Sequence, residues 1–325
     1  MTPSRRKAKR AKNKPSKTAA SRNKKNKTIV AAVLDSQKLQ DLYAAMLRAH
    51  LLQKWAKDIL PASQEESSQL ENGREAVLAG AIAHMLPGDS LAAVQDEFLA
   101  SFVRGLPLTS IVEQIVAGDS QPSAGTERNR TRTHALNTLQ RGVALGVESK
   151  GKPLAVLCYF GEHASAAYDT LNLAAKDKLP LVCVAEAKLS GAEDQNASAS
   201  SAHGARNFPQ ITVDGNDVVA IFRVAQEAVR RARSGHGPSL IECLFSEEKS
   251  APGRTDQSPG TLAFMQAYLQ RRSLWSDEWQ QKIVREFQQE LDAAIANAPN
   301  AHGKLDRVSA PDRSSTRSPQ RLELS

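Results

Sequence analysis

The sequence predicts an α/β protein with a doubly wound parallel sheet, flanked by N- and C-terminal helices. Between positions 154 and 245, short apolar runs alternate with amphipathic segments of helical length. Strands separated by such helices pair in parallel, with helices on both faces of the sheet. Gly161 and Lys188 stand at the ends of two of these apolar runs. Because ligands bind at the carboxyl ends of strands in such sheets, these two positions mark the expected site.

The part of the chain before the sheet is expected to be helical. Apolar residues recur at three-and-four spacing over 36–56, which is typical of an amphipathic helix. The small-residue segment 73–86 predicts a second helix that Pro87 ends. We expect further helices over 91–103, 108–116 and 136–148, with a loop over 118–132.

The sheet itself is expected to come from four apolar runs, and two helices close the domain. The expected strands are 154–160, 181–186, 210–213 and 239–245, the helices between them 164–176 and 217–234, and the Ser- and Ala-rich loop 189–204. After them, periodic apolar residues predict helices over 262–271 and 278–296. Ser276 is the expected N-cap of the last helix.

Three cysteines occur in the expected strands, among apolar neighbours: Cys158, Cys183 and Cys243. They show neither a Cys-x-x-Cys motif nor another paired spacing, so neither a metal site nor a disulfide framework is indicated. We interpret them as packing thiols of a protein in the reducing cytoplasm. No apolar run approaches the roughly 18 residues that span a bilayer, so no transmembrane segment is predicted.

The net charge of +8 belongs to a tail rather than to the fold. Residues 1–28 hold twelve of the 43 Lys and Arg and no acid, which leaves 31 basic against 35 acidic residues. Without Leu, Ile, Val or Phe up to position 28, we expect 1–30 to be a disordered basic tail. Its partner is either anionic (nucleic acid, lipid or an acidic protein) or absent, the tail then being a solubilising arm. We expect one domain over 31–298 and a second disordered tail over 299–325.

A series of short segments occurs in the order and spacing of one known family. They are Gly73-Arg74-Glu75-Ala76, Pro87-Gly88-Asp89, Arg104-Gly105, Leu171–Ala175 with Lys178-Leu179-Pro180, Val213–Val218, Ala232–Pro238 and Leu240-Ile241-Glu242. By these segments the chain, from about 37 to 296, resembles the alpha subunit of the thiamine-diphosphate-dependent dehydrogenase (decarboxylating) component of 2-oxo acid dehydrogenase complexes. The resemblance implies a sheet of the thiamine-diphosphate-binding type, thiamine diphosphate and Mg²⁺ as cofactors, and a beta-type subunit or a second copy as partner.

The resemblance also implies where the cofactor would be held, and this sequence departs from the family there. Gly161-Glu162-His163 stands for a Gly-Asp-Gly turn whose Asp binds the metal, so Glu162 is the one candidate metal ligand. Lys188 stands for an Asn whose amide oxygen binds the same ion, and an ammonium group has no acceptor to offer. The family's Tyr-Arg pair, which reaches the diphosphate, and a following His fall on Gln95, Asp96 and Phe98.

Further departures agree with these. An Arg and a Gly-His-Ser segment of the family fall on Glu247 and on Ser250-Ala251, and three residues are missing between Ala164 and Leu171. Acids in place of Arg repel a diphosphate. An internal Glu162–Lys188 ion pair is one substitute for the metal. His163 is interpreted as a turn residue rather than as a catalytic acid.

These observations lead to one main hypothesis and two alternatives. In the first, the chain is an alpha-like subunit with a degenerate cofactor site and a structural or regulatory role in an alpha/beta assembly. Small-residue strips around Gly73–Gly80 and Gly142–Gly146 would then pack against a like subunit or a beta-type partner. In the second, the chain is an active thiamine-dependent subunit that decarboxylates a 2-oxo acid and passes the acyl group to a lipoyl carrier. In the third, its basic tail makes it an adaptor for nucleic acid or a membrane surface.

Overall fold

The computed structural model describes residues 34–59, 74–93, 97–117, 127–160, 168–189, 207–246 and 260–298, with backbone alone at 97, 127–134, 188, 189 and 246. The chain divides into two units, Met1–Ser36 and Gln37–Ser325. The second unit holds the sheet and, apart from Ser36, the described helices. The predicted tails 1–30 and 299–325 lie outside the described residues.

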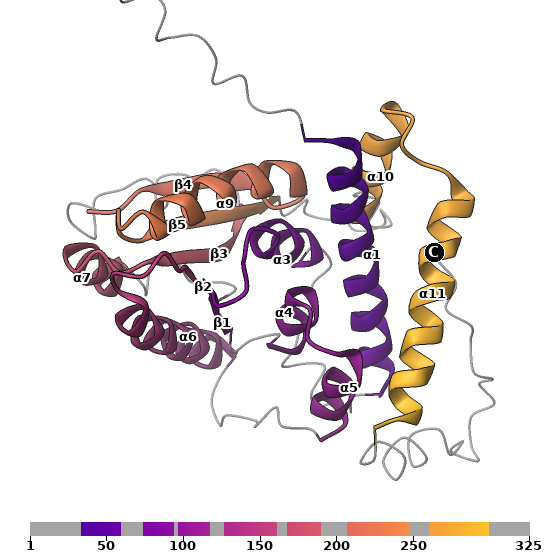
Figure 1. The fold of residues 1–325 in the computed structure, drawn as a ribbon, viewed down its shortest axis with the longest axis horizontal. Coiled ribbons are helices and arrows are strands. Elements are labelled where there is room, and N and C mark those ends of the chain that lie inside the picture. The colour runs from indigo at the N-terminus through magenta and orange to yellow at the C-terminus, as the bar shows by residue number, and fades with distance from the viewer. Residues whose placement is uncertain are drawn as a thin grey trace, which may run out of the picture. The chain divides into compact units, whose positions relative to one another are not determined.

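The centre of this unit is a sheet in which five described strands run parallel, as the sequence predicted (Figure 1). The strands are β1 (Ser90–Ala93), β2 (Val156–Tyr159), β3 (Leu181–Leu189), β4 (Gln210–Asp214) and β5 (Ser239–Ser246). Their order in the sheet is β1-β2-β3-β5-β4. Since all five point the same way, their carboxyl ends share one edge.

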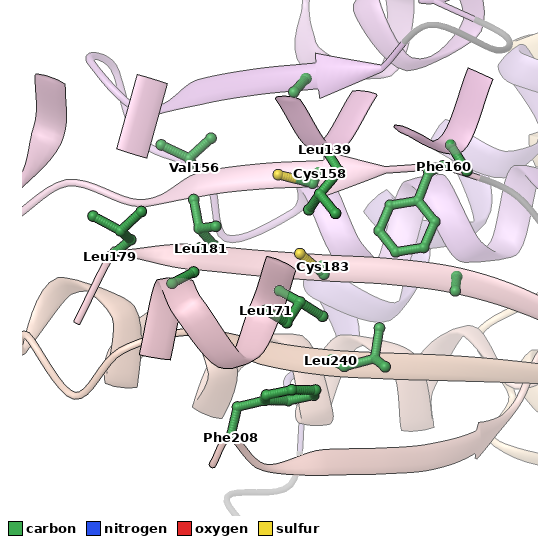
Figure 2. Close-up of a cluster of buried hydrophobic side chains, with 14 of the residues drawn as sticks. Leu139, Val156, Cys158, Phe160, Leu171, Leu179, Leu181, Cys183, Phe208 and Leu240 are labelled. Atoms are coloured by element: carbon green, nitrogen blue, oxygen red, sulfur yellow. The ribbon is translucent and has the colours of Figure 1, made fainter. Parts of the chain in front are cut away.

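Helices cover both faces of the sheet, so the doubly wound α/β class is confirmed (Figure 1). On one face, α6 (Glu127–Ser149) and α7 (Tyr168–Lys176) pack on β2 and β3 through Leu139 and Leu171. Figure 2 shows this layer, in which Cys158, Cys183 and Leu240 of three neighbouring strands also take part. On the other face lies α9 (Val218–Arg233), and α3 (Arg74–Ile82) packs against α9.

The central strands β2 and β3 are buried on both faces over residues 156–159 and 181–185, which explains why these segments are continuous apolar runs rather than alternating ones. Val156 to Tyr159 and Leu181 to Ala185 are all at most 1% exposed. The strands expected from these runs are confirmed, with small changes at their ends.

The other helices in the described part of the chain are α1 (Ser36–Ile59), α4 (Glu97–Arg104), α5 (Leu108–Ala117), α10 (Thr261–Arg271) and α11 (Asp277–Ala296). The N- and C-terminal helices lie side by side (Figure 1). Tyr43 of α1 meets the edge of Trp275 at 4.8 Å between ring centroids. The Gln40 side chain donates to the Leu274 carbonyl at 3.1 Å. Ser276 caps α11 as predicted, accepting from the Trp279 N–H at 3.2 Å.

Some expected boundaries were wrong. The helix expected over 91–103 begins instead as strand β1, which pairs with β2 from Ser90↔Val156 to Ala93↔Tyr159. Pairing with the sheet overrode a local sequence of good helix formers. Helix α6 begins at Glu127, inside the loop expected over 118–132, and β3 continues to Leu189 because it pairs with β5 that far.

Gly80, Gly142 and Gly146 pack inside this chain, which corrects the interface expected from them, and Gly73 lies outside the described residues. A Cβ on Gly142 would overlap the Cys158 sulfur, and one on Gly146 would lie 2.7 Å from Leu181 Cδ2. A Cβ on Gly80 would lie 2.8 Å from Ile221 Cγ2 of α9. The absence of side chains at these positions lets α6 approach the sheet and α3 approach α9.

The three cysteines are buried and free, which confirms their interpretation as packing thiols. The pKa of Cys183 is raised well above its usual value by a hydrogen bond with Cys158 and by burial. Burial likewise raises the pKa of Cys243 far above the ordinary thiol range. Thiols held neutral in this way are poor nucleophiles. Among the described helices, none is both long and apolar enough to cross a bilayer.

Candidate functional site

The expected site lies at the carboxyl edge of the sheet, where β1, β2 and β3 end side by side. Lys188 is the penultimate residue of β3, and its backbone pairs with Phe245 of β5. The chain enters Gly161 two residues after β2 ends and enters Gln95 two residues after β1 ends. Because β1, β2 and β3 are neighbours in the sheet, their carboxyl ends lie next to one another, and the predicted site residues occur at or directly after these ends in the sequence.

The structure describes only part of the predicted set. Phe98 lies on α4 and is partly buried. The other predicted positions fall outside the described residues: Gly161, Glu162, His163, Gln95, Asp96, Glu247, Ser250 and Ala251. The expected Glu162–Lys188 ion pair is therefore untested.

A buried polar network stands on β3 two residues before Lys188. Glu186 accepts a hydrogen bond from the Tyr159 hydroxyl of β2 at 2.5 Å and one from Arg74 Nε of α3 at 3.3 Å. The two donors reach different carboxylate oxygens, and both charged side chains are 5% exposed. The network joins β2, β3 and the first turn of α3 beside the expected site.

The next residue of α3, Glu75, contacts a different element, α10. Glu75 is 2% exposed and accepts a hydrogen bond from the Thr261 hydroxyl of α10 at 2.6 Å. Burial lowers the pKa of His50 on α1, although the negative charge of Glu75 acts in the opposite direction. The first turn of α3 therefore connects the sheet edge with the N- and C-terminal helices.

A second buried carboxylate lies on the opposite face of the sheet. Glu242 of β5 accepts a hydrogen bond from the Tyr168 hydroxyl at 3.0 Å and another from the Gln210 amide of β4. Tyr168 is the first residue of α7. The contact fixes the start of that helix against β5, which is a structural task.

Asp89 organises the amino edge of the sheet, away from the expected site. Its carboxylate accepts from the backbone N–H groups of Leu86 and Ala155 at 2.7 and 2.8 Å and pairs with Arg233 of α9. Arg104 donates to the carbonyls of Leu86 and Asp89. These hydrogen bonds and the Asp89–Arg233 ion pair thus hold the Pro87-Gly88-Asp89 segment in place at the start of β1.

Comparison with known proteins identifies the family. Residues 64–245 match the family described as the dehydrogenase E1 component, which is more than half of the chain. The chain belongs to this family. It is 31% identical over 230 residues to the alpha subunit of acetoin:2,6-dichlorophenolindophenol oxidoreductase of Bacillus subtilis (strain 168), covering 64% of this chain and 67% of that protein.

Two further relatives from the same organism are also alpha subunits. The alpha subunit of the pyruvate dehydrogenase E1 component is 28% identical over 180 residues, covering 48% of each chain. The alpha subunit of 2-oxoisovalerate dehydrogenase is 29% identical over 182 residues, covering 49% of this chain and 55% of that protein. The matched region spans about half the length of these two relatives. The resemblance inferred from the sequence, to an E1 alpha subunit with a parallel α/β fold, is confirmed.

The E1 family depends on thiamine diphosphate, and Lys188 is the described residue at the carboxyl edge that stands where the resemblance implies a ligand of the cofactor's metal ion. A magnesium ion takes oxygen ligands in a near-ideal octahedron. Lys188 offers an ammonium group, which has no acceptor. Glu186, the buried carboxylate nearest to it along β3, already accepts from Arg74 and Tyr159. Within the described part of the chain, no group of His, Cys, Asp and Glu residues is placed to hold a metal ion.

Sequence reasoning missed the residues that dominate the described part of this edge. Arg74 and Glu75 were noted only as part of a family segment, and Glu186 and Tyr159 only as parts of strands. One signal was present: Arg74, Glu75 and Glu186 are charged residues within apolar segments. Charged side chains at such positions are rarely buried without a partner.

Proposed function

We propose that this chain is a noncatalytic alpha-type subunit of a dehydrogenase E1 component, with a structural or regulatory role in an alpha/beta assembly. It keeps the parallel α/β fold of the family but does not hold thiamine diphosphate and Mg²⁺. The chemistry of a decarboxylation would then belong to another chain.

The observation that supports the proposal most directly is the residue type near the end of β3. Lys188 is the penultimate residue of that strand, where the resemblance implies an amide oxygen on the metal. A lysine ammonium repels Mg²⁺ and supplies no lone pair, so one of the two protein ligands is lost outright. Glu162 is the second departure, because its additional methylene displaces the carboxylate by about one bond length in a site with little tolerance.

Membership of the E1 family supports the part of the proposal in which this chain associates with another subunit. The relatives named above are all alpha subunits, so we expect this chain to associate with a beta-type subunit or with a second copy of itself. Its own packing surfaces differ from those first expected, since the glycines of α3 and α6 are used inside the chain.

The test is calorimetric titration of thiamine diphosphate with Mg²⁺ into the protein, alone and co-purified with a beta-type subunit. We expect no binding heat for the wild-type chain. The matched variant Glu162→Asp/Lys188→Asn restores both ligands by type, and we expect it to gain measurable affinity. Micromolar binding by the wild-type chain that is lost in Glu162→Ala would overturn the proposal and make the chain an active subunit.

A further inference from the structure

A groove between α1, α3 and α4 lies apart from the expected cofactor site. Its volume is about 290 Å³, and the three helices that line it lie next to one another (Figure 1). The apolar side chains that line it include Leu42, Ile82, Met85 and Val103. Met85 comes shortly before the Pro87-Gly88-Asp89 segment at the start of β1, so the groove lies near the amino edge of the sheet.

Two exposed leucines extend this apolar surface beyond the groove. Leu86 directly follows Met85 and is 54% exposed, and Leu106 lies two residues after the lining residue Arg104 and is 39% exposed. Arg104 Nη2 donates to the Leu86 carbonyl at 2.8 Å, so the segment after α3 and the end of α4 meet beside the groove. Single exposed apolar side chains are common, but two of them beside an apolar groove are typical of a surface that another molecule covers.

The charged side chains that line the groove favour a partner with acidic groups. They are the cations Lys38 and Arg104 and one acid, Asp41, which already accepts a hydrogen bond from the Gln37 amide at 2.8 Å. The Lys38 ammonium lies 5.5 Å from the centroid of the Phe222 ring, so Arg104 is the cation best placed for a partner.

Arg104 is also fixed in position before any partner binds. One terminal nitrogen of its guanidinium donates to two backbone carbonyls, those of Leu86 and Asp89, at 2.8 and 3.2 Å. A guanidinium has five N–H donors, so these two bonds leave donors for a carboxylate of another molecule. A donor that is already held in place loses little conformational freedom on binding.

We propose that this groove is a docking site for an amphipathic helix of a partner protein, with apolar side chains on one face and Asp or Glu beside them. A helix bound in such a groove anchors itself through side chains at i, i+3 or i+4, and i+7. One anchor enters the groove, the next covers Leu86 and Leu106, and an acidic side chain accepts from Arg104. The inference goes beyond the proposed function, because it holds whether or not the carboxyl edge binds a cofactor.

The test is titration of the full chain with a synthetic helical peptide that carries Leu at i, i+4 and i+7 and Glu beside them. A second peptide has Lys in place of Glu. Methyl NMR of the methionines reports where the peptide binds, because Met85 lines the groove whereas Met46 and Met265 are at most 1% exposed. We expect the acidic peptide to shift the Met85 signal and to leave those of Met46 and Met265 in place. The basic peptide is expected to bind about tenfold more weakly.

A double variant and a matched control test the contribution of the exposed leucines. Leu86→Ser/Leu106→Ser is expected to weaken binding of the acidic peptide about tenfold or more, measured by fluorescence anisotropy. Val147→Ser/Leu173→Ser is the control, since these apolar side chains on α6 and α7 are each 59% exposed, and we expect it to leave the affinity unchanged. The comparison of the two peptides on the wild-type chain needs no variant, so the proposal stays testable if the double variant fails to fold.

The basic residues 1–28 also attract an acidic peptide, so the site of binding decides the outcome. Binding that leaves the Met85 signal unchanged, or that is equally tight in Leu86→Ser/Leu106→Ser and in the wild type, would overturn the inference. The absence of binding would overturn it as well. A wild-type dimer in analytical ultracentrifugation that becomes a monomer in Leu86→Ser/Leu106→Ser would show that a second copy, and not an acidic helix, covers this surface.

Discussion

Replacing Gly80 by alanine tests whether the small-residue strip of α3 packs inside this chain or against a partner. A Cβ there would lie 2.8 Å from Ile221 Cγ2, 3.0 Å from Ile221 Cβ and 3.1 Å from the Val218 carbonyl oxygen, where ordinary contact begins at 3.4 Å. Overpacking of this kind costs about 1–3 kcal/mol. Alanine returns about 1 kcal/mol through its better helix propensity. We expect a net loss of about 0–2 kcal/mol in the free energy of unfolding.

The assay is urea unfolding, read as a shift in midpoint at constant slope. Ile221→Ala alone is expected to cost about 2–5 kcal/mol, because it opens a cavity at a fully buried position. In that background the space beside residue 80 is larger, so the penalty of Gly80→Ala is expected to fall to near zero. Gly260→Ala is the control, since nothing lies within 4 Å of its added Cβ.

The reasoning fails if Gly80→Ala leaves the unfolding midpoint unchanged while it alters the mass of the assembly in light scattering. That result would place Gly80 on an intermolecular surface. The reasoning would also be contradicted if Gly80→Ala lowered the free energy of unfolding equally in the wild-type protein and in the Ile221→Ala variant. The contact with Ile221 of α9 would then not be the cause of the loss.

Three further outcomes follow from the buried polar groups. Asp89→Asn removes the charge that pairs with Arg233, and we expect the free energy of unfolding to fall by about 2–3 kcal/mol in chemical unfolding. An unchanged midpoint would show that this ion pair does not stabilise the fold. Thr261→Val leaves the buried Glu75 without that donor and is expected to cost about 1–3 kcal/mol, whereas Thr261→Ser should cost much less. Burial lowers the pKa of His84, so the unfolded chain binds the extra proton more readily and stability falls as the pH drops below about 6.5. His84→Gln should flatten this part of the stability–pH curve, and a slope equal to that of wild type would refute the assignment.

The sheet could be predicted because the central strands can be recognised from their own sequences, without knowledge of the strands with which they pair. A strand segment that is buried on both faces is usually apolar throughout, and β2 and residues 181–185 of β3 show this pattern in the sequence. Strand β1 could not be found in this manner. Its four residues, Ser90–Ala93, suit a helix by propensity, and only pairing with β2 makes them a strand.

The described part of the site was harder to predict, because its contacts are long-range. Arg74 and Glu186 are 112 residues apart, and neither position shows its partner in the sequence. The glycines of α6 gave a different kind of error. Their spacing shows correctly that one helix face is smooth, but a sequence does not say which surface covers that face, and the sheet of the same chain does so.

The most direct test of the central claim is a crystal of the protein soaked with thiamine diphosphate and Mn²⁺, the manganese ion taking the place of Mg²⁺. Anomalous scattering from Mn²⁺ then reports occupancy beside β3 independently of the coenzyme. We predict no anomalous peak at the carboxyl edge, with Arg74 still bound to Glu186. An octahedral Mn²⁺ on Glu162, with the diphosphate seated against Lys188, would contradict the account.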